Sequence, residues 1–183
     1  MQGWRKSFQI KLCQHQQSCP KIITRKEWGA LKPKARTPLS TPVKYAVIHH
    51  SDTPKCHSKM KCIERVRSIQ EYHMHHNHWS DIGYNFLIGS DGNVYEGRGS
   101  DTVGAHTKFY NSQSIGICVI GNYSSSRPNW PSLIALKRLL SCLKNNKKLK
   151  NDYSLKGHRD LSPTKCPGKY LYNNITHWPH YKY

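Results

Sequence analysis

Four short stretches of the chain are apolar and bounded by turn-forming residues. The runs 45–48 and 114–120 are almost continuously apolar, which is typical of strands buried on both faces. The runs 84–88 and 94–96 flank the turn sequence Gly-Ser-Asp-Gly-Asn, and Asp-Gly between apolar runs predicts a β-hairpin. These segments predict the strands of one sheet.

Three longer segments have the spacing of helices. In residues 60–76 apolar side chains recur every three positions, which predicts an amphipathic helix. A second helix is predicted to begin at Trp130-Pro131, with proline in the first turn, and to end within 145–150. Residues 169–176 are predicted to form a short last helix. The pattern as a whole predicts an α/β fold, a single domain with a central mixed β-sheet flanked by helices.

The domain is predicted to span residues 19–183, because residues 1–18 form an N-terminal extension with little apolar content. No run of eighteen apolar residues occurs, so no membrane span is expected. The extension also lacks the apolar stretch of a signal peptide.

The charge of the chain is strongly positive. With 29 basic and 10 acidic residues the formal net charge is +19, which favours an anionic partner such as nucleic acid, a sulfated glycan, an acidic membrane or a bacterial wall. The basic residues are spread from Lys6 to Lys182 rather than gathered in one arm, so solvated surface explains most of them.

Seven cysteines, at positions 13, 19, 56, 62, 118, 142 and 166, are many for a cytosolic chain of this length. Together with two glycosylation sequons, at Asn122 and Asn174, they favour a secreted, extracellular protein with disulfides. Cys56 and Cys62 are close enough to close a small loop. Because the count is odd, at least one cysteine has no disulfide partner within the chain.

A candidate metal site lies near the C-terminus. His158 and Cys166 are separated by a segment rich in proline and glycine, whose composition predicts a turn-rich loop that folds back on itself. The pair His49-His50, at the end of the apolar run 45–48, is the best source of a third ligand. Three His and Cys ligands with a fourth position open to water are typical of a hydrolytic zinc. A second metal site is conceivable among the histidines of 73–78, but a solvated helix end is the preferred interpretation there.

Several ordered motifs resemble those of the animal peptidoglycan recognition proteins, which share a fold with zinc-dependent phage amidases. The resemblance covers residues 19 to 183 and rests on blocks distributed along that length. They are Val47-Ile48-His49-His50-Ser51, Asp81-Ile82-Gly83-Tyr84-Asn85-Phe86-Leu87-Ile88-Gly89, Asp91-Gly92, Tyr95-Glu96-Gly97-Arg98-Gly99, Gly104-Ala105-His106, Ser114-Ile115-Gly116-Ile117, Gly157-His158-Arg159-Asp160 and Cys166-Pro167-Gly168.

The resemblance implies specific roles. His49, His158 and Cys166 are the expected zinc ligands, and Tyr84 is the expected catalytic tyrosine facing the metal-bound water. Thr164 occupies the second catalytic position, two residues before the cysteine, where catalytic members carry threonine or lysine. Non-catalytic members typically lose the cysteine or the first histidine, and this chain has both.

The resemblance also implies a substrate groove and disulfides. The groove is expected to be lined by His50, His73, Trp79, Arg98, His106 and Asn111. Trp79 favours a stem peptide of the diaminopimelate type, whereas His78 before it departs from the family's pattern. The expected disulfides are Cys56–Cys62 and Cys19–Cys142, and Cys13 has no evident partner.

The function implied is that of a zinc-dependent N-acetylmuramoyl-L-alanine amidase of innate immunity. Such an enzyme binds bacterial peptidoglycan and cleaves the lactyl-amide bond between muramic acid and the stem peptide. Teichoic acid or lipopolysaccharide are further partners for the basic surface, and no nucleic acid is expected. Three alternatives remain: a non-catalytic peptidoglycan binder, a cationic antimicrobial or nucleic-acid-binding protein acting by charge alone, and a thiol hydrolase using Cys166 and His158.

Overall fold

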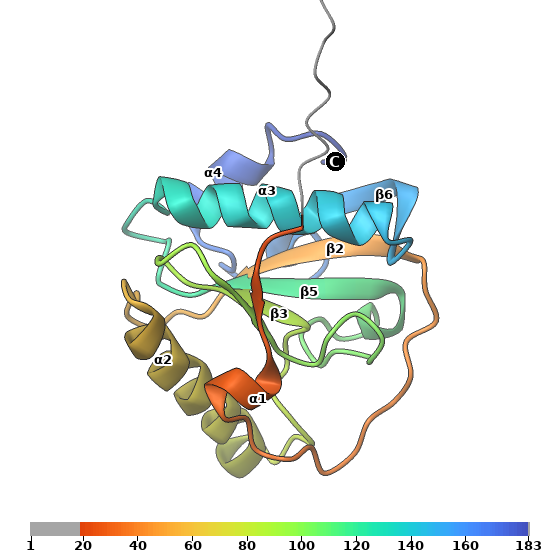
Figure 1. The fold of residues 1–183 in the computed structure, drawn as a ribbon. Coiled ribbons are helices and arrows are strands. Elements are labelled where there is room, and N and C mark those ends of the chain that lie inside the picture. Colours follow the sequence, from red (N-terminus) through yellow and green to blue (C-terminus); the bar gives the residue numbers. More distant parts are fainter. Residues whose placement is uncertain (1–18, 183) are drawn as a thin grey trace, which may run out of the picture.

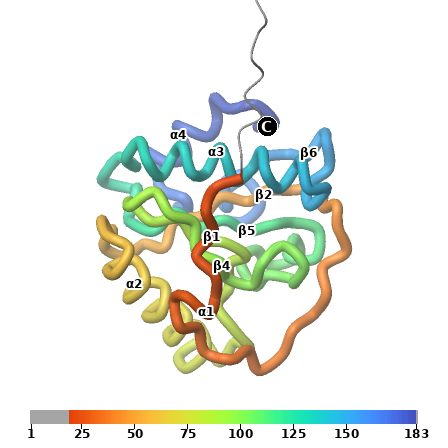
Figure 2. Tube along the Cα trace, viewed as in Figure 1, coloured from red at the N-terminus to blue at the C-terminus, as the bar shows by residue number. Residues whose placement is uncertain are grey.

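A six-stranded mixed sheet forms the centre of the part of the chain that the computed structural model describes, residues 19–182 (Figure 1). Its spatial order is β1-β4-β3-β5-β2-β6. The strands are β1 (Ile22–Ile23), β2 (Val43–His50), β3 (Phe86–Ile88), β4 (Val94–Glu96), β5 (Ser114–Val119) and β6 (Leu149–Gly157). β3 and β4 form an antiparallel hairpin, and the other neighbouring strands run parallel. β1 lies beside β4, far from it in sequence (Figure 2).

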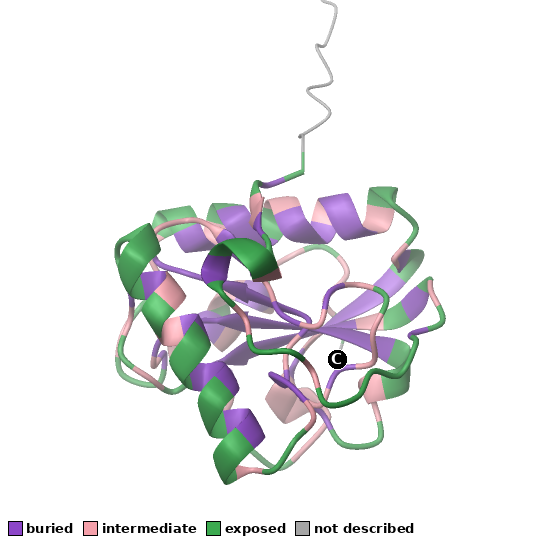
Figure 3. Ribbon diagram, turned by 60° about the horizontal axis from the view of Figure 1, so that its bottom comes forward, coloured by how far each residue is buried: buried purple, intermediate pink, exposed green. Residues whose placement is uncertain are grey.

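Helices cover both faces of this sheet and make a three-layer architecture (Figure 1). The helices α3 (Trp130–Asn145) and α4 (Lys169–Ile175) share one apolar core with the sheet, and α1 (Arg25–Trp28) and α2 (Lys59–Glu71) share the other. Alternate residues of β5 enter the two cores: Ile117 faces the α3 side and Cys118 the α2 side. The strands between the helices are therefore buried along most of their length (Figure 3). The single α/β domain with a mixed sheet is confirmed. Among the described residues, no helix has both the length and the apolar character needed to cross a bilayer.

The predicted helix over 60–76 is correct in its location, and Val66 and Ile69 of its predicted apolar face are buried, but the two ends of that face are wrong. Met60 and Tyr72 are 71% and 54% exposed, whereas the residues that α2 buries are Cys62, Val66, Ile69 and Gln70. A repeat of three falls behind the 3.6-residue turn by about 60° at each step, so it cannot stay on one face over four steps. The segment Tyr72–His76 continues as a π-helix, η1.

The strand β6 was not predicted, and residues 157–168 were expected to form a loop. Instead, Gly157 is the last residue of β6, and His158 opens the 3-10 turn η3 (His158–Asp160). β6 lies at the edge of the sheet, and its residues 150–152 are exposed, so polar side chains occupy these positions and hide the apolar alternation. The hairpin and the strand over 114–120 are confirmed, with β3 beginning only at Phe86.

Both expected disulfides are present. Cys19–Cys142 ties the start of the described chain to α3, and Cys56–Cys62 closes the loop that leads into α2. Cys118 is a buried free thiol in β5, and Cys166 is the other free cysteine among the described residues. Cys13 lies outside the described residues.

Candidate metal centre

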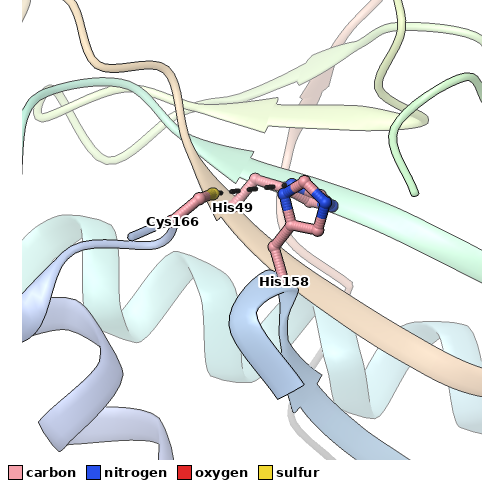
Figure 4. Close-up of side chains that lie close together, drawn as sticks. All are labelled: His49, His158 and Cys166. Atoms are coloured by element: carbon pink, nitrogen blue, oxygen red, sulfur yellow. Dashed lines mark hydrogen bonds between the residues drawn. The ribbon is translucent and has the colours of Figure 1, made fainter. Parts of the chain in front are cut away.

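Two histidines and one cysteine meet at the carboxyl ends of β2 and β6. These strands pair in parallel with Ile48 opposite Gly157, so the next residue of each, His49 and His158, lie side by side. The turns after η3 then return the chain, and Cys166 reaches the same point (Figure 4). The candidate ligand atoms of His49, His158 and Cys166 all lie within 4.8 Å of one another.

The geometry of this cluster suits one small cation. Cys166 Sγ lies 3.7 Å from His49 Nδ1, and the centroids of the His49 and His158 rings are 4.6 Å apart. Zinc bonds of about 2.0 Å to nitrogen and 2.3 Å to sulfur span more than the distance between the first two atoms, so one ion can bridge them. A His₂Cys donor set is also one that zinc accepts in catalytic sites. The residues therefore fit zinc.

Burial sets the protonation of the three groups. His49 is 2% exposed, and desolvation holds its pKa well below the ordinary value, with the positive forms of His106 and His158 acting in the same direction. Desolvation also lowers the pKa of His158. Burial raises the pKa of the Cys166 thiol to about 12, against the effects of the hydrogen bond from His50 N and of the Arg159 charge. Neutral imidazoles are ready to bind metal, whereas the thiol needs a cation to become a thiolate.

Tyr84 and Thr164 lie beside this cluster. The ring of Tyr84 is 5.3 Å from that of His49, and desolvation raises the pKa of its phenol well above the ordinary value. The phenol is thus a hydrogen-bond donor at neutral pH. Thr164 is exposed, and its Oγ1 accepts a hydrogen bond from Cys166 N at 3.2 Å.

A cleft of about 600 Å³ opens over the cluster. Its lining contains all five residues predicted as ligands or catalytic groups, together with His50, Trp79 and His106 of the expected substrate groove. His50 also donates its backbone N–H to Cys166 Sγ at 3.4 Å. The lining further includes residues that were not predicted: Ser51, Asp52, Ala105, Asn122, Ser124 and Lys165. Ser51 and Asp52 directly follow His49-His50, and their position next to a predicted ligand could have indicated that they line the cleft.

The other three expected groove residues lie outside this lining and bond to the backbone. His73 Nδ1 accepts a hydrogen bond from Gly83 N at 3.0 Å, and its ring packs 4.7 Å from that of Trp79. Asn111 Oδ1 accepts hydrogen bonds from His106 N and Thr107 N, both at 2.9 Å. These residues support the walls of the cleft.

Arg98 likewise makes its contacts with main-chain atoms. Its guanidinium donates to the carbonyl oxygens of Ile82 and Val103, at 2.7 and 2.9 Å. Desolvation lowers its pKa. A side chain bonded in this way fastens the segment before β3 to the loop after β4.

No second cluster of three metal-binding side chains occurs in residues 19–182. Of the histidines that follow α2, His73 is buried, and His75, His76 and His78 are exposed. They do not converge.

Fold and cluster together define an α/β protein with a candidate metal-dependent hydrolytic site at the carboxyl edge of a mixed sheet. Comparison with known proteins agrees with this class. A family model described as N-acetylmuramoyl-L-alanine amidase matches residues 39–169. Peptidoglycan-recognition protein SC2 of Drosophila melanogaster is 44% identical over 161 residues, 88% of each chain. Peptidoglycan recognition protein 1 of Bos taurus is 42% identical over 167 residues, 91% of this chain and 88% of that protein.

A solved structure of a related protein is also similar to this chain, in both sequence and fold. It is peptidoglycan recognition protein-LE in complex with tracheal cytotoxin, which is monomeric diaminopimelic acid-type peptidoglycan. The TM-score is 0.86 at 41% identity, and the match covers 88% of this chain and 95% of that one. The chain belongs to the peptidoglycan recognition protein family, with its amidase-type domain.

Proposed function

We propose that this protein is a zinc-dependent N-acetylmuramoyl-L-alanine amidase. It binds peptidoglycan and hydrolyses the amide between the lactyl group of muramic acid and the stem peptide. The observation that carries the proposal is the convergence of His49, His158 and Cys166 in one cleft with Tyr84. A chain that only recognised its ligand would have no need of three metal-binding side chains in the lining of the cleft.

A metal held here would supply what an amide of low reactivity requires. His49, His158 and Cys166 would hold a zinc ion, which polarises a carbonyl and makes water a stronger nucleophile near neutral pH. Since the three side chains are buried or half-buried, solvent would screen the charge of such an ion poorly.

Tyr84 contributes a donor for the charge that develops on the reacting oxygen. Its phenol stays protonated because burial raises its pKa, and its ring lies 5.3 Å from that of His49. A donor held beforehand in a desolvated site stabilises a transition state without reorganisation. Thr164 also lines the cleft, where its Oγ1 accepts a hydrogen bond from the backbone N–H of Cys166.

The substrate is a muropeptide that lies along the cleft. Trp79 provides an apolar wall, His50 provides a polar group, and His106 completes the lining. His73 and Asn111 act from behind, through Trp79 and His106 respectively. In this scheme Arg98 orders the loop behind the groove. A preference for diaminopimelate-type stem peptides is supported by Trp79 and by the ligand named for the related protein-LE structure.

We infer that the protein acts outside the cell, in innate immunity. Its two disulfides support an oxidising compartment. Residues 19–183 are proposed as the functional domain, with residues 1–18 as an extension. Teichoic acid and lipopolysaccharide remain predictions from the net charge of +19 alone.

A second candidate is a protein that binds peptidoglycan without cutting it, because the relatives are named as recognition proteins. Release of stem peptide from purified peptidoglycan, followed by mass spectrometry, separates the two. We expect release by the zinc-loaded protein, none after chelation, and recovery when zinc is restored. Cys166→Ser is the matched variant and should release nothing. Binding without release by the zinc-loaded wild type would support the second candidate.

A further inference from the structure

His106 lies behind the candidate ligand His49. The two ring nitrogens of His49 face different partners: Nδ1 lies 3.7 Å from Cys166 Sγ, and Nε2 lies 3.0 Å from His106 Nδ1. The exposed fractions of His49 and His106 are 2% and 9%, so water does not replace either contact. When two imidazole nitrogens face each other at this distance, one donates a proton and the other accepts it.

The hydroxyl of Ser114 lies beside the other ring nitrogen of His106. The Ser114 hydroxyl donates to the carbonyl oxygen of Tyr110 at 2.7 Å. Its lone pairs are therefore the part of the hydroxyl that faces His106 Nε2, 3.5 Å away. This arrangement favours the tautomer of His106 that carries its proton on Nε2 and presents a lone pair at Nδ1. In that case the proton of His49 is on Nε2, and Nδ1 of His49 is free to bind a metal.

The position of His106 is fixed by its surroundings. A Cβ atom at Gly116 would lie 2.3 Å from Cδ2 of the His106 ring, and one at Gly104 would lie 2.4 Å from the same atom. The ring thus occupies a slot that exists because both positions are glycine. On the backbone side, Asn111 Oδ1 accepts the N–H groups of His106 and Thr107. Thr107 Oγ1 lies 3.0 Å from His106 Nδ1 and 3.5 Å from His49 Nε2, beside the contact between the two rings.

We propose that His106 is a positioning residue for the metal, which holds His49 in the tautomer that has its Nδ1 lone pair available. This inference rests on the proposed zinc function and assigns a task to a residue that the family resemblance gives only to the substrate groove. Partners of this kind behind a metal ligand typically contribute 10–100-fold, as an order of magnitude, to metal affinity.

Zinc affinity, measured by competition with a chromophoric chelator on the full chain, tests the proposal. His106→Phe keeps a ring in the slot but removes the acceptor, and we expect zinc to bind about 10–100-fold more weakly. His106→Gln restores an acceptor oxygen and should recover most of that loss. His75→Phe is the matched control, because it makes the same substitution at an exposed histidine of η1 that belongs to no metal-binding group among the described residues, and its zinc affinity should equal that of the wild type.

Long-range ¹H–¹⁵N correlation spectra of the zinc-loaded wild type test the tautomer directly and need no variant. We expect the proton of His106 on Nε2. A proton on Nδ1, or a zinc affinity of His106→Phe within twofold of the wild type, would overturn the inference and leave the amidase proposal intact. Failure of the wild type itself to bind zinc would instead overturn the proposed function, and with it this inference.

Discussion

Two histidine-rich regions of this protein behave in opposite ways. Four histidines lie within 73–78, on and after the π-helix η1, yet three of them are exposed and none meets another in a metal-binding group among the described residues. His49 and His158 are far apart in the sequence, yet their rings lie 4.6 Å apart. Residues at the ends of two neighbouring parallel strands lie side by side, as His49 and His158 do. Residues along one exposed helical segment instead spread around the helix axis.

Desolvation is the second difference between these regions. His49 is buried, and its pKa is held low, whereas His76 stacks on the exposed ring of Tyr72 at a centroid distance of 4.6 Å. An exposed imidazole remains hydrated, and one such side chain without neighbouring ligands holds a metal ion poorly. The comparison indicates that convergence and burial, and not the density of histidines, make the site.

The largest effect is expected from removing a ligand. Cys166→Ser and His49→Ala should each abolish zinc retention and reduce hydrolysis to the uncatalysed background, because two remaining ligands hold the ion poorly. Metal content after dialysis and stem-peptide release are the measurements. The double variant His75→Ala/His76→Ala, in the other histidine-rich region, should retain both. Full hydrolysis by metal-free Cys166→Ser would contradict the assignment.

Tyr84→Phe is expected to lower kcat by about 10²–10³-fold while KM changes little, since the phenol donates where charge develops in the transition state. Steady-state kinetics on a soluble muropeptide would measure both constants. A normal kcat with a raised KM would make Tyr84 a substrate contact alone.

His73 is the buried histidine of the region 73–78, and we expect it to make the stability of the folded protein depend on pH. Desolvation, followed by the Arg98 charge, lowers its pKa to about 4, and the nearby Asp81 opposes this shift. In the unfolded chain His73 takes up a proton near pH 6.5, whereas in the folded chain it does so only near pH 4. The contribution of neutral His73 to the free energy of unfolding is therefore complete above pH 6.5 and is lost as the pH falls to about 4. The loss amounts to about 3 kcal/mol.

Thermal or denaturant unfolding between pH 7 and 4, compared for the wild type and His73→Gln, measures this contribution. The variant should have a flatter profile over that interval, and the exposed matched variant His76→Gln should follow the wild type. Parallel profiles for wild type and His73→Gln would contradict the low pKa of His73.

Salt is expected to weaken binding to whole bacteria and to have the smallest effect of these changes on hydrolysis at the metal centre. Raising the salt concentration to about 0.5 M should release the protein from whole bacteria. The Debye length is about 8 Å at physiological salt and shortens further as salt is added, so the attraction between exposed charges weakens. Turnover of a small muropeptide depends on short-range contacts and should change little. Cell binding that is indifferent to salt would make the charge of +19 ordinary solubilising surface.

The sequence by itself determined the parts of the fold whose patterns are local. The hairpin of β3 and β4 follows from Asp-Gly between apolar runs, and β2 and β5 follow from apolar runs buried on both faces. The sequence also indicated which residues could bind the metal, since the histidine His49 at a strand end and the cysteine Cys166 in a turn-rich segment are evident without coordinates.

Tertiary structure decided what depends on pairing between distant segments. β6 was not predicted because an edge strand need not be apolar, and its register with β2 is what sets His158 beside His49. The contact of His106 with His49, and the slot between Gly104 and Gly116 that holds it, belong to no local pattern. Strand register and the closeness of two backbones are set by packing across the whole sheet, so one stretch of sequence does not contain them.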